Sequence, residues 1–167
     1  MSGFSRDLAV LEPWELSGGY TGTVSLTDAV QGPLLKLHQR LYERSGGRVG
    51  HRMIGVPTLL LRSTGRRSGA RRCNALVYAM DGADYVLVAS NGGADSSPGW
   101  FFNVRDQPAV EVQVARKSSP GTARVLEHGD PDYDRLWRLV NEKNHGRYDA
   151  YQAGTARPIP LVVVSAG

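Results

Sequence analysis

Short apolar runs joined by tight turns dominate the chain from Pro57 onward, and they constrain its fold more than any other feature. Asp81-Gly82 separates two of these runs and is typical of a two-residue hairpin turn. Residues 110–114 (VEVQV) alternate apolar and polar side chains, which is the period of a half-buried strand. Links this short join antiparallel strands, because parallel strands need longer crossovers. The sequence therefore predicts a mainly antiparallel α+β protein built on a sheet or small barrel.

The predicted strands cover residues 58–63, 72–80, 84–90, 110–114, 122–127 and 159–164. We expect the strand at 122–127 to pair with the one before it across a turn at 118–121. A short helix is predicted after Pro98. A longer one is predicted from Asp130-Pro131, with the aspartate as N-cap and the proline as first residue. The apolar face of the longer helix consists of Leu136, Trp137 and Val140.

The N-terminal part of the chain has a different pattern. Residues 1–24 are rich in glycine without any apolar period, which predicts an irregular arm. Residues 25–47 predict a helix whose leucine stripe suits packing on a sheet, although a membrane surface would accept the same stripe. The expected organisation is an arm over 1–24 and one domain over 25–167, with the barrel and the functional site in 56–167.

An arginine-rich composition points to an anionic partner. The chain of 167 residues has a formal net charge of +4, and arginine outnumbers lysine. Guanidinium groups present a rigid fork of donors that suits phosphate and carboxylate. GC-rich codons would produce the same overall bias, but they would not produce local clusters.

The single cysteine, Cys73, excludes a disulfide framework and favours a reducing compartment. The N-terminus lacks the basic start and apolar centre of a signal peptide. No apolar run approaches the ~20 residues that span a bilayer. We therefore expect a cytoplasmic protein, and contact of the 25–47 helix with a membrane surface stays open.

An arginine-crowded turn is the strongest candidate binding feature. Residues 64–69 read TGRRSG, and Arg71 and Arg72 follow directly. Backbone N–H groups of such a turn, together with guanidinium groups, bind anions well. The turn lacks the lysine and spacing of a P-loop, and the chain shows no base-stacking platform, so nucleic acid is not an expected partner. A solvated basic hairpin is the alternative.

Small residues and an aromatic pair follow the third predicted strand. Residues 90–95 read SNGGAD, and adjacent glycines let a backbone approach a ligand closely. Trp100 and Phe101 have faces that can stack on a planar ring, although core packing explains them equally well. With the arginine turn, these features predict a site for a flat, anionic cofactor.

Other catalytic arrangements are not indicated. The four histidines lack metal-ligand spacing, so no metal site is expected. Ser90 lacks the G-x-S-x-G elbow of a serine hydrolase. Tyr148 and Tyr151 stand three residues apart, on one face if the segment is helical, and they could line a pocket, donate a proton or simply pack.

The order and spacing of three motifs resemble the deazaflavin-dependent nitroreductase family of actinobacteria. The motifs are TGRRSG at 64–69 with Arg72, VASNGGAD at 88–95 and PGWFFN at 98–103. The resemblance implies a split β-barrel of the type that binds flavin mononucleotide (FMN), with flanking helices. It also implies coenzyme F420, a flat 8-hydroxy-5-deazaflavin with a phosphodiester and an oligoglutamate tail.

The resemblance further implies roles for particular residues. Arginines would hold the phosphate and the glutamate tail, and backbone segments would line the ring and the ribityl chain. The residues implied in cofactor binding are Arg66, Arg67, Arg72, Asn74, Ala75, Leu76, Val77, Ser90, Asn91, Gly92, Gly93, Ala94, Trp100 and Asn103. The residues implied in substrate binding are Ser90, Tyr148 and Tyr151. Tyr148 or solvent would supply a proton.

The implied activity is hydride transfer from the reduced cofactor to an electron-poor small molecule such as an enone, a quinone or a nitro compound, by a monomer or a homodimer. Asn91 replaces a lysine of many relatives, Val77 replaces a tyrosine of some nitro-reducing relatives, and His145 stands where a third pocket tyrosine can occur. These differences concern the substrate more than the cofactor. A non-catalytic carrier of deazaflavin or tetrapyrrole, and an FMN-dependent oxidoreductase, remain as alternatives.

Overall fold

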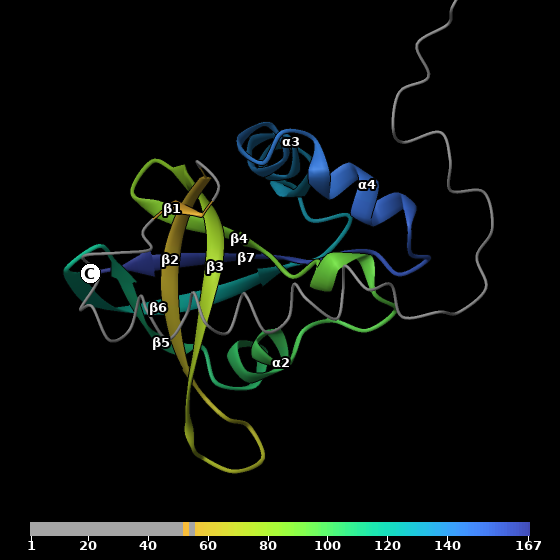
Figure 1. Ribbon diagram of the computed structural model, residues 1–167. Coiled ribbons are helices and arrows are strands. Elements are labelled where there is room, and N and C mark those ends of the chain that lie inside the picture. Colours follow the sequence, from red (N-terminus) through yellow and green to blue (C-terminus); the bar gives the residue numbers. More distant parts are fainter. Residues whose placement is uncertain (1–51, 54–55) are drawn as a thin grey trace, which may run out of the picture.

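Six antiparallel strands close into a barrel in the computed structural model, which describes residues 52–53 and 56–167 (Figure 1). The strands of the barrel are β2 (Val56–Thr64), β3 (Arg71–Asp81), β4 (Asp84–Val88), β5 (Ala109–Val114), β6 (Lys117–Leu126) and β7 (Leu161–Ala166), and β1 (Arg52–Met53) pairs with β2. Neighbouring strands follow the order β2-β3-β4-β7-β6-β5, and β5 pairs with β2 to close the ring. The predicted antiparallel barrel is confirmed.

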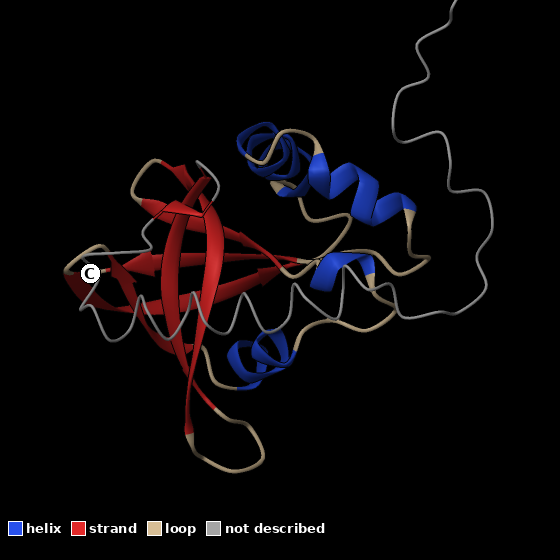
Figure 2. Ribbon diagram, viewed as in Figure 1, coloured by secondary structure: helices blue, strands red, loops and turns tan. Residues whose placement is uncertain are grey.

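Helices lie on two sides of this barrel. Figure 2 shows α3 (Tyr133–Lys143) and α4 (Arg147–Ala153) together on one side and α2 (Gly99–Asp106) on another. A short 3₁₀ helix, η1 (Asn91–Gly93), follows β4. No helix in the described part of the chain is long and apolar enough to cross a membrane. The arm predicted over 1–24 and the helix predicted over 25–47 lie outside the described residues.

Two hydrophobic clusters share β4 and β7. The first fills the barrel and is closed by α2, and it includes Leu87 and Val162. The second lies under α3 and α4, and it includes Val86 and Val163. Both faces of these two strands are therefore buried, which explains why their sequences are continuous apolar runs. The outer face of β5 carries Glu111 and Gln113 instead, so β5 keeps the alternating pattern of a half-buried strand.

The turn predicted at 118–121 is wrong. β5 and β6 are joined by the two-residue turn Ala115-Arg116, and Ala115 has a positive φ of 50°. The Gln113 side chain donates a hydrogen bond to the Ala115 carbonyl (2.9 Å) and supports this turn. Ser118, which suggested a turn, lies within β6 and donates to Glu111 of the neighbouring strand (2.5 Å).

The predicted start of the longer helix is also corrected. Helix α3 begins at Tyr133, three residues after Asp130. The Asp130 carboxylate accepts a hydrogen bond from the backbone N–H of Glu127 (2.7 Å), so it closes the preceding loop rather than capping the helix. Leu136 and Val140 are buried as expected, together with Tyr133, whereas Trp137 is half-buried.

Candidate functional site

A cavity of about 470 Å³ lies between the β2–β3 turn and helix α2. The turn closes through hydrogen bonds from the backbone N–H groups of Gly65 and Gly69, to Ala70 O (2.8 Å) and Gly65 O (2.7 Å). The side-chain oxygen of Asn103 in α2 accepts a hydrogen bond from the backbone N–H of Arg66 (3.1 Å). This bond joins the turn to the helix and fixes two walls of the cavity relative to each other.

Six of the residues predicted to bind a cofactor border this cavity. They are Arg66, Arg67, Arg72, Asn74, Trp100 and Asn103. Gly65 also borders it, and an added Cβ there would lie 3.0 Å from both Ala70 O and Ser68 Oγ. The tight turn leaves no room for a side chain at Gly65, which brings the flanking arginines close to the cavity.

The arginines of the turn differ in their partners. Arg71 and Arg62 both pair with Glu111 on the outer face of the barrel. Arg66 lies 4.0 Å from the Asp106 carboxylate. Within the described residues, neither Arg67 nor Arg72 forms an ion pair. The cavity therefore has an excess of positive charge, which favours an anionic ligand.

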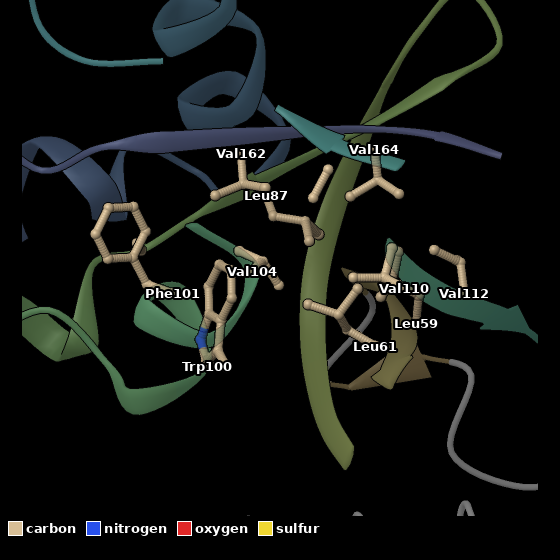
Figure 3. Close-up of a cluster of buried hydrophobic side chains, with 12 residues drawn as sticks. Leu59, Leu61, Leu87, Trp100, Phe101, Val104, Val110, Val112, Val162 and Val164 are labelled. Carbon is tan, nitrogen blue, oxygen red and sulfur yellow. The ribbon is translucent and has the colours of Figure 1, made fainter. Parts of the chain in front are cut away.

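The aromatic residues of α2 divide between the core and the cavity. Trp100 and Phe101 are buried among strand residues such as Leu61 and Leu87 (Figure 3). Trp100 also borders the cavity. Phe102, which the sequence reasoning missed, is half-buried at the cavity, and the Arg66 guanidinium lies 5.0 Å from its ring centre. Helical spacing could have identified it, because Phe102 and Asn103 follow Gly99 by three and four residues.

The 90–94 loop has an unusual backbone. Positive φ angles occur at Asn91 (52°), Gly92 (66°) and Gly93 (83°). Asparagine and glycine tolerate this conformation best. A Cβ added at Gly93 would lie 2.9 Å from the carbonyl oxygen of Tyr151, so the loop packs directly on the backbone of α4.

Arg157, between α4 and β7, contacts this loop and was not identified from the sequence. Its guanidinium donates hydrogen bonds to the carbonyl oxygens of Ala89 (3.2 Å), Ser90 (2.7 Å) and Ala94 (2.8 Å), and to Ser97 Oγ (3.2 Å). Desolvation lowers the pKa of Arg157, and the Asp95 carboxylate opposes that shift. No local pattern separates this arginine from the others in the sequence, because its contacts lie about sixty residues away.

Tyr148 and Tyr151 lie on α4, a helix that the sequence did not predict. Tyr148 is buried between Trp137 and Tyr151, with ring centres 6.3 Å and 6.2 Å away, and burial raises its pKa above the ordinary value of a phenol. Its backbone N–H donates to the Asn141 side chain (3.0 Å), which ties α4 to α3. Tyr151 is half-buried and touches the loop at Gly93.

The remaining predicted cofactor residues do not border the cavity. They are Ala75, Leu76, Val77 and the loop residues Ser90, Asn91, Gly92, Gly93 and Ala94. Leu76 packs against the barrel core, and alternation along β3 turns Ala75 and Val77 to the other face. β3 pairs with β4 only from Tyr78 onward, so residues 71–77 have β2 as their one strand neighbour among the described residues. One backbone edge of this segment therefore has no strand partner there.

Comparisons with known proteins agree with these features. A family model described as F420H(2)-dependent quinone reductase matches residues 34–166. F420H(2)-dependent quinone reductase Rv1261c of Mycobacterium tuberculosis is 47% identical over 133 residues, which cover 79% of this chain and 89% of the relative.

Solved structures show the same similarity. An F420-H2 dependent reductase (FDR-A) is 38% identical with a TM-score of 0.59, and the match covers 65% of this chain and 93% of that one. A structure described as a domain-swapped dimer is 33% identical with a TM-score of 0.61, covering 83% and 98%. These matches confirm the resemblance to deazaflavin-dependent reductases and the split barrel.

Proposed function

This chain belongs to the F420H(2)-dependent quinone reductase family and is an F420-dependent oxidoreductase, and we propose that a quinone is its acceptor. When bound in reduced form, F420 supplies a hydride to an electron-poor carbon or oxygen. The names of the family and its relatives support a quinone as acceptor, and the arginine-lined cavity beside α2 supports the binding of F420. The residues of this chain hold and orient the two reactants.

The arginine turn fits the anionic part of F420. We propose that Arg66, Arg67 and Arg72 bind the phosphodiester and the glutamate tail through charge-assisted hydrogen bonds. Asn103 fixes the turn on α2 through the Arg66 backbone (3.1 Å), so the guanidinium groups start from a preorganised backbone. Asn74 and Trp100 complete the proposed cofactor contacts at this cavity.

Two backbone segments suit the flat part of the cofactor. The proposed contacts are the edge of Asn74, Ala75, Leu76 and Val77, which lacks a strand partner on one side, and the 90–94 loop. Glycine at 92 and 93 permits a close approach of that backbone to a planar ring. Such contacts orient the ring and exclude water from one face.

For the acceptor, we propose a position beside Ser90 and Tyr151. Tyr148 was predicted as a proton donor, but its burial and raised pKa make its proton harder to release. We therefore propose solvent as the proton source and packing as the role of Tyr148. The oligomeric state (monomer or homodimer), a cytoplasmic location and contact with a membrane surface stay predictions.

The test is a titration of the full chain with F420 and, in parallel, with FMN, followed by Trp fluorescence. We expect selective binding of F420 at micromolar concentration or below. Turnover is then measured from the recovery of oxidised F420 absorbance, with reduced F420 and a water-soluble benzoquinone, an enone or a nitroarene.

We expect the benzoquinone to be reduced fastest. Selective binding of FMN would contradict the cofactor assignment. Reduction of the enone or the nitroarene in preference to the benzoquinone would overturn the proposed acceptor while leaving the cofactor site intact.

A further inference from the structure

Arg157 makes an unusually complete set of contacts with one loop. All four of its hydrogen bonds to this loop fall between Ala89 and Ser97, and three of the acceptors are backbone carbonyls. An arginine fork can bind several oxygens at fixed angles, whereas a lysine ammonium presents a single point of charge. The Arg157 side chain, which is distant in sequence, therefore helps to hold the loop in one shape.

These contacts also determine where the loop amides point. The C=O and N–H groups of a trans peptide point in opposite directions, and the described residues contain no cis peptide bond. Because Ala89 O and Ser90 O both face the guanidinium, the N–H groups of Ser90 and Asn91 point away from it. In the described part of the chain, the Ser90 N–H has no hydrogen-bond acceptor. A ligand on that side would meet an oriented backbone donor.

The segment that carries Arg157 is itself fixed. The Gln152 side chain donates to Arg157 O (2.9 Å) and accepts from the backbone N–H of Ile159 (2.9 Å). Thr155 Oγ1 lies 3.4 Å from the Asp95 carboxylate and adds a second link to the loop. Arg157 thus connects the loop to the end of α4 and the start of β7, two rigid elements.

We infer that Arg157 is a positioning residue, which orients the 90–94 backbone for contact with the deazaflavin ring. This inference rests on the proposed contact between that loop and the cofactor. It assigns Arg157 no contact with cofactor or acceptor. Loss of the guanidinium would therefore reduce the fraction of molecules whose loop is ready to bind, and it would leave the charge of the arginine turn unchanged.

The test compares Arg157→Lys and Arg157→Ala with Arg138→Ala, which removes an exposed arginine of α3. Hydrogen–deuterium exchange of the protein without cofactor reports the loop directly. We expect faster exchange of amides 90–97 in both Arg157 variants and no change in Arg138→Ala. We also expect F420 affinity about 10-fold weaker and kcat lowered roughly 10-fold to 100-fold.

The lysine variant separates positioning from charge. We expect Arg157→Lys to bind F420 about as weakly as Arg157→Ala, with the salt dependence of the wild type. Restoration of affinity by lysine would show that the charge itself acts on the ligand, and it would overturn the inference. Unchanged exchange and affinity in both variants would also overturn it. Failure of the wild type to bind F420 would instead refute the proposed cofactor site.

Discussion

The arginine turn and the 90–97 loop form a contrast within one proposed site. The turn is exposed, and two of its arginines at the cavity have no carboxylate partner in the described residues. The loop carries no basic residue, and its backbone is held by Arg157, by Asn91 and by the close approach of Gly93 to α4. One region supplies charge and the other supplies fixed geometry.

This contrast suggests that the arginine turn provides affinity for the cofactor and that the loop aligns its ring. Exposed guanidinium groups attract a polyanion over several ångströms, but they are screened by salt and tolerate variation in position. A hydride-transfer step requires the reacting atoms to be aligned closely, which needs a rigid backbone near the ring. We therefore expect changes in the turn to alter binding, and changes in the loop to alter binding and turnover together.

The largest effect on the loop is expected from Gly93→Ala. The new Cβ would meet Tyr151 O at 2.9 Å in a left-handed backbone conformation, so the loop must move away from α4. We expect a loss of about 2–3 kcal/mol in stability and weaker F420 binding. Gly92→Ala is the matched control, because its φ of 66° is similar and its Cβ would meet nothing within 4 Å.

Chemical denaturation of both glycine variants measures this difference in stability. Gly92→Ala should lower the free energy of unfolding by about 1 kcal/mol, because only the left-handed backbone conformation disfavours the new side chain. Equal losses in the two variants would show that contact with α4 does not hold the loop.

Tyr148→Phe tests whether the Tyr148 hydroxyl donates a proton in the reaction. In the described part of the chain, the Tyr148 hydroxyl has no hydrogen-bond partner. The contacts of Tyr148 with Trp137 and Tyr151 are made by its aromatic ring. We expect kcat to change less than about threefold, far below the ~10² to 10⁴ of a lost general acid. A decrease near a hundredfold, with folding intact, would return Tyr148 to the role of proton donor.

Glu111→Gln has the smallest expected effect, and it concerns the arginines that are not at the cavity. Hydrogen bonding from Ser118, followed by the charges of Arg62 and Arg71, lowers the pKa of Glu111. A lowered folded-state pKa stabilises the protein above about pH 4.3, the ordinary value for Glu. That stabilisation is lost as the pH falls through the folded-state value.

Thermal unfolding as a function of pH measures this contribution. At pH 7 the Gln variant should be less stable by about 0.2–1 kcal/mol, as for other exposed ion pairs. The difference from the wild type should vanish in acid, and a difference that persists there would assign the effect to packing.

The sequence predicted the barrel and the arginine turn because both depend on local patterns. The alternation in 110–114 and the TGRRSG turn can be recognised within a few residues. The Ala115-Arg116 turn escaped prediction because neither residue is typical of a positive φ, and the polar Ser118 nearby gave a competing signal. Gln113 supports that turn from two residues away, and the pairing of Val114 with Lys117 places the turn at Ala115-Arg116.

The other features that were not predicted depend on contacts between distant segments. Arg157 reaches carbonyls more than sixty residues away, and its role follows only from the path of the chain. The sequence predicted neither helix α4, which carries Tyr148 and Tyr151, nor the burial of Tyr148 against α3.

The most direct measurement is the affinity for F420 as a function of salt concentration, for the wild type and for the Arg66→Ala/Arg72→Ala double variant. The wild-type affinity should fall as salt rises, because exposed charges are screened within ~10 Å at 0.1 M. The double variant should fold normally, bind about 10-fold to 100-fold more weakly at low salt, and show a smaller salt dependence. Wild-type affinity and salt dependence in the double variant would contradict the assignment of the arginine turn to the cofactor.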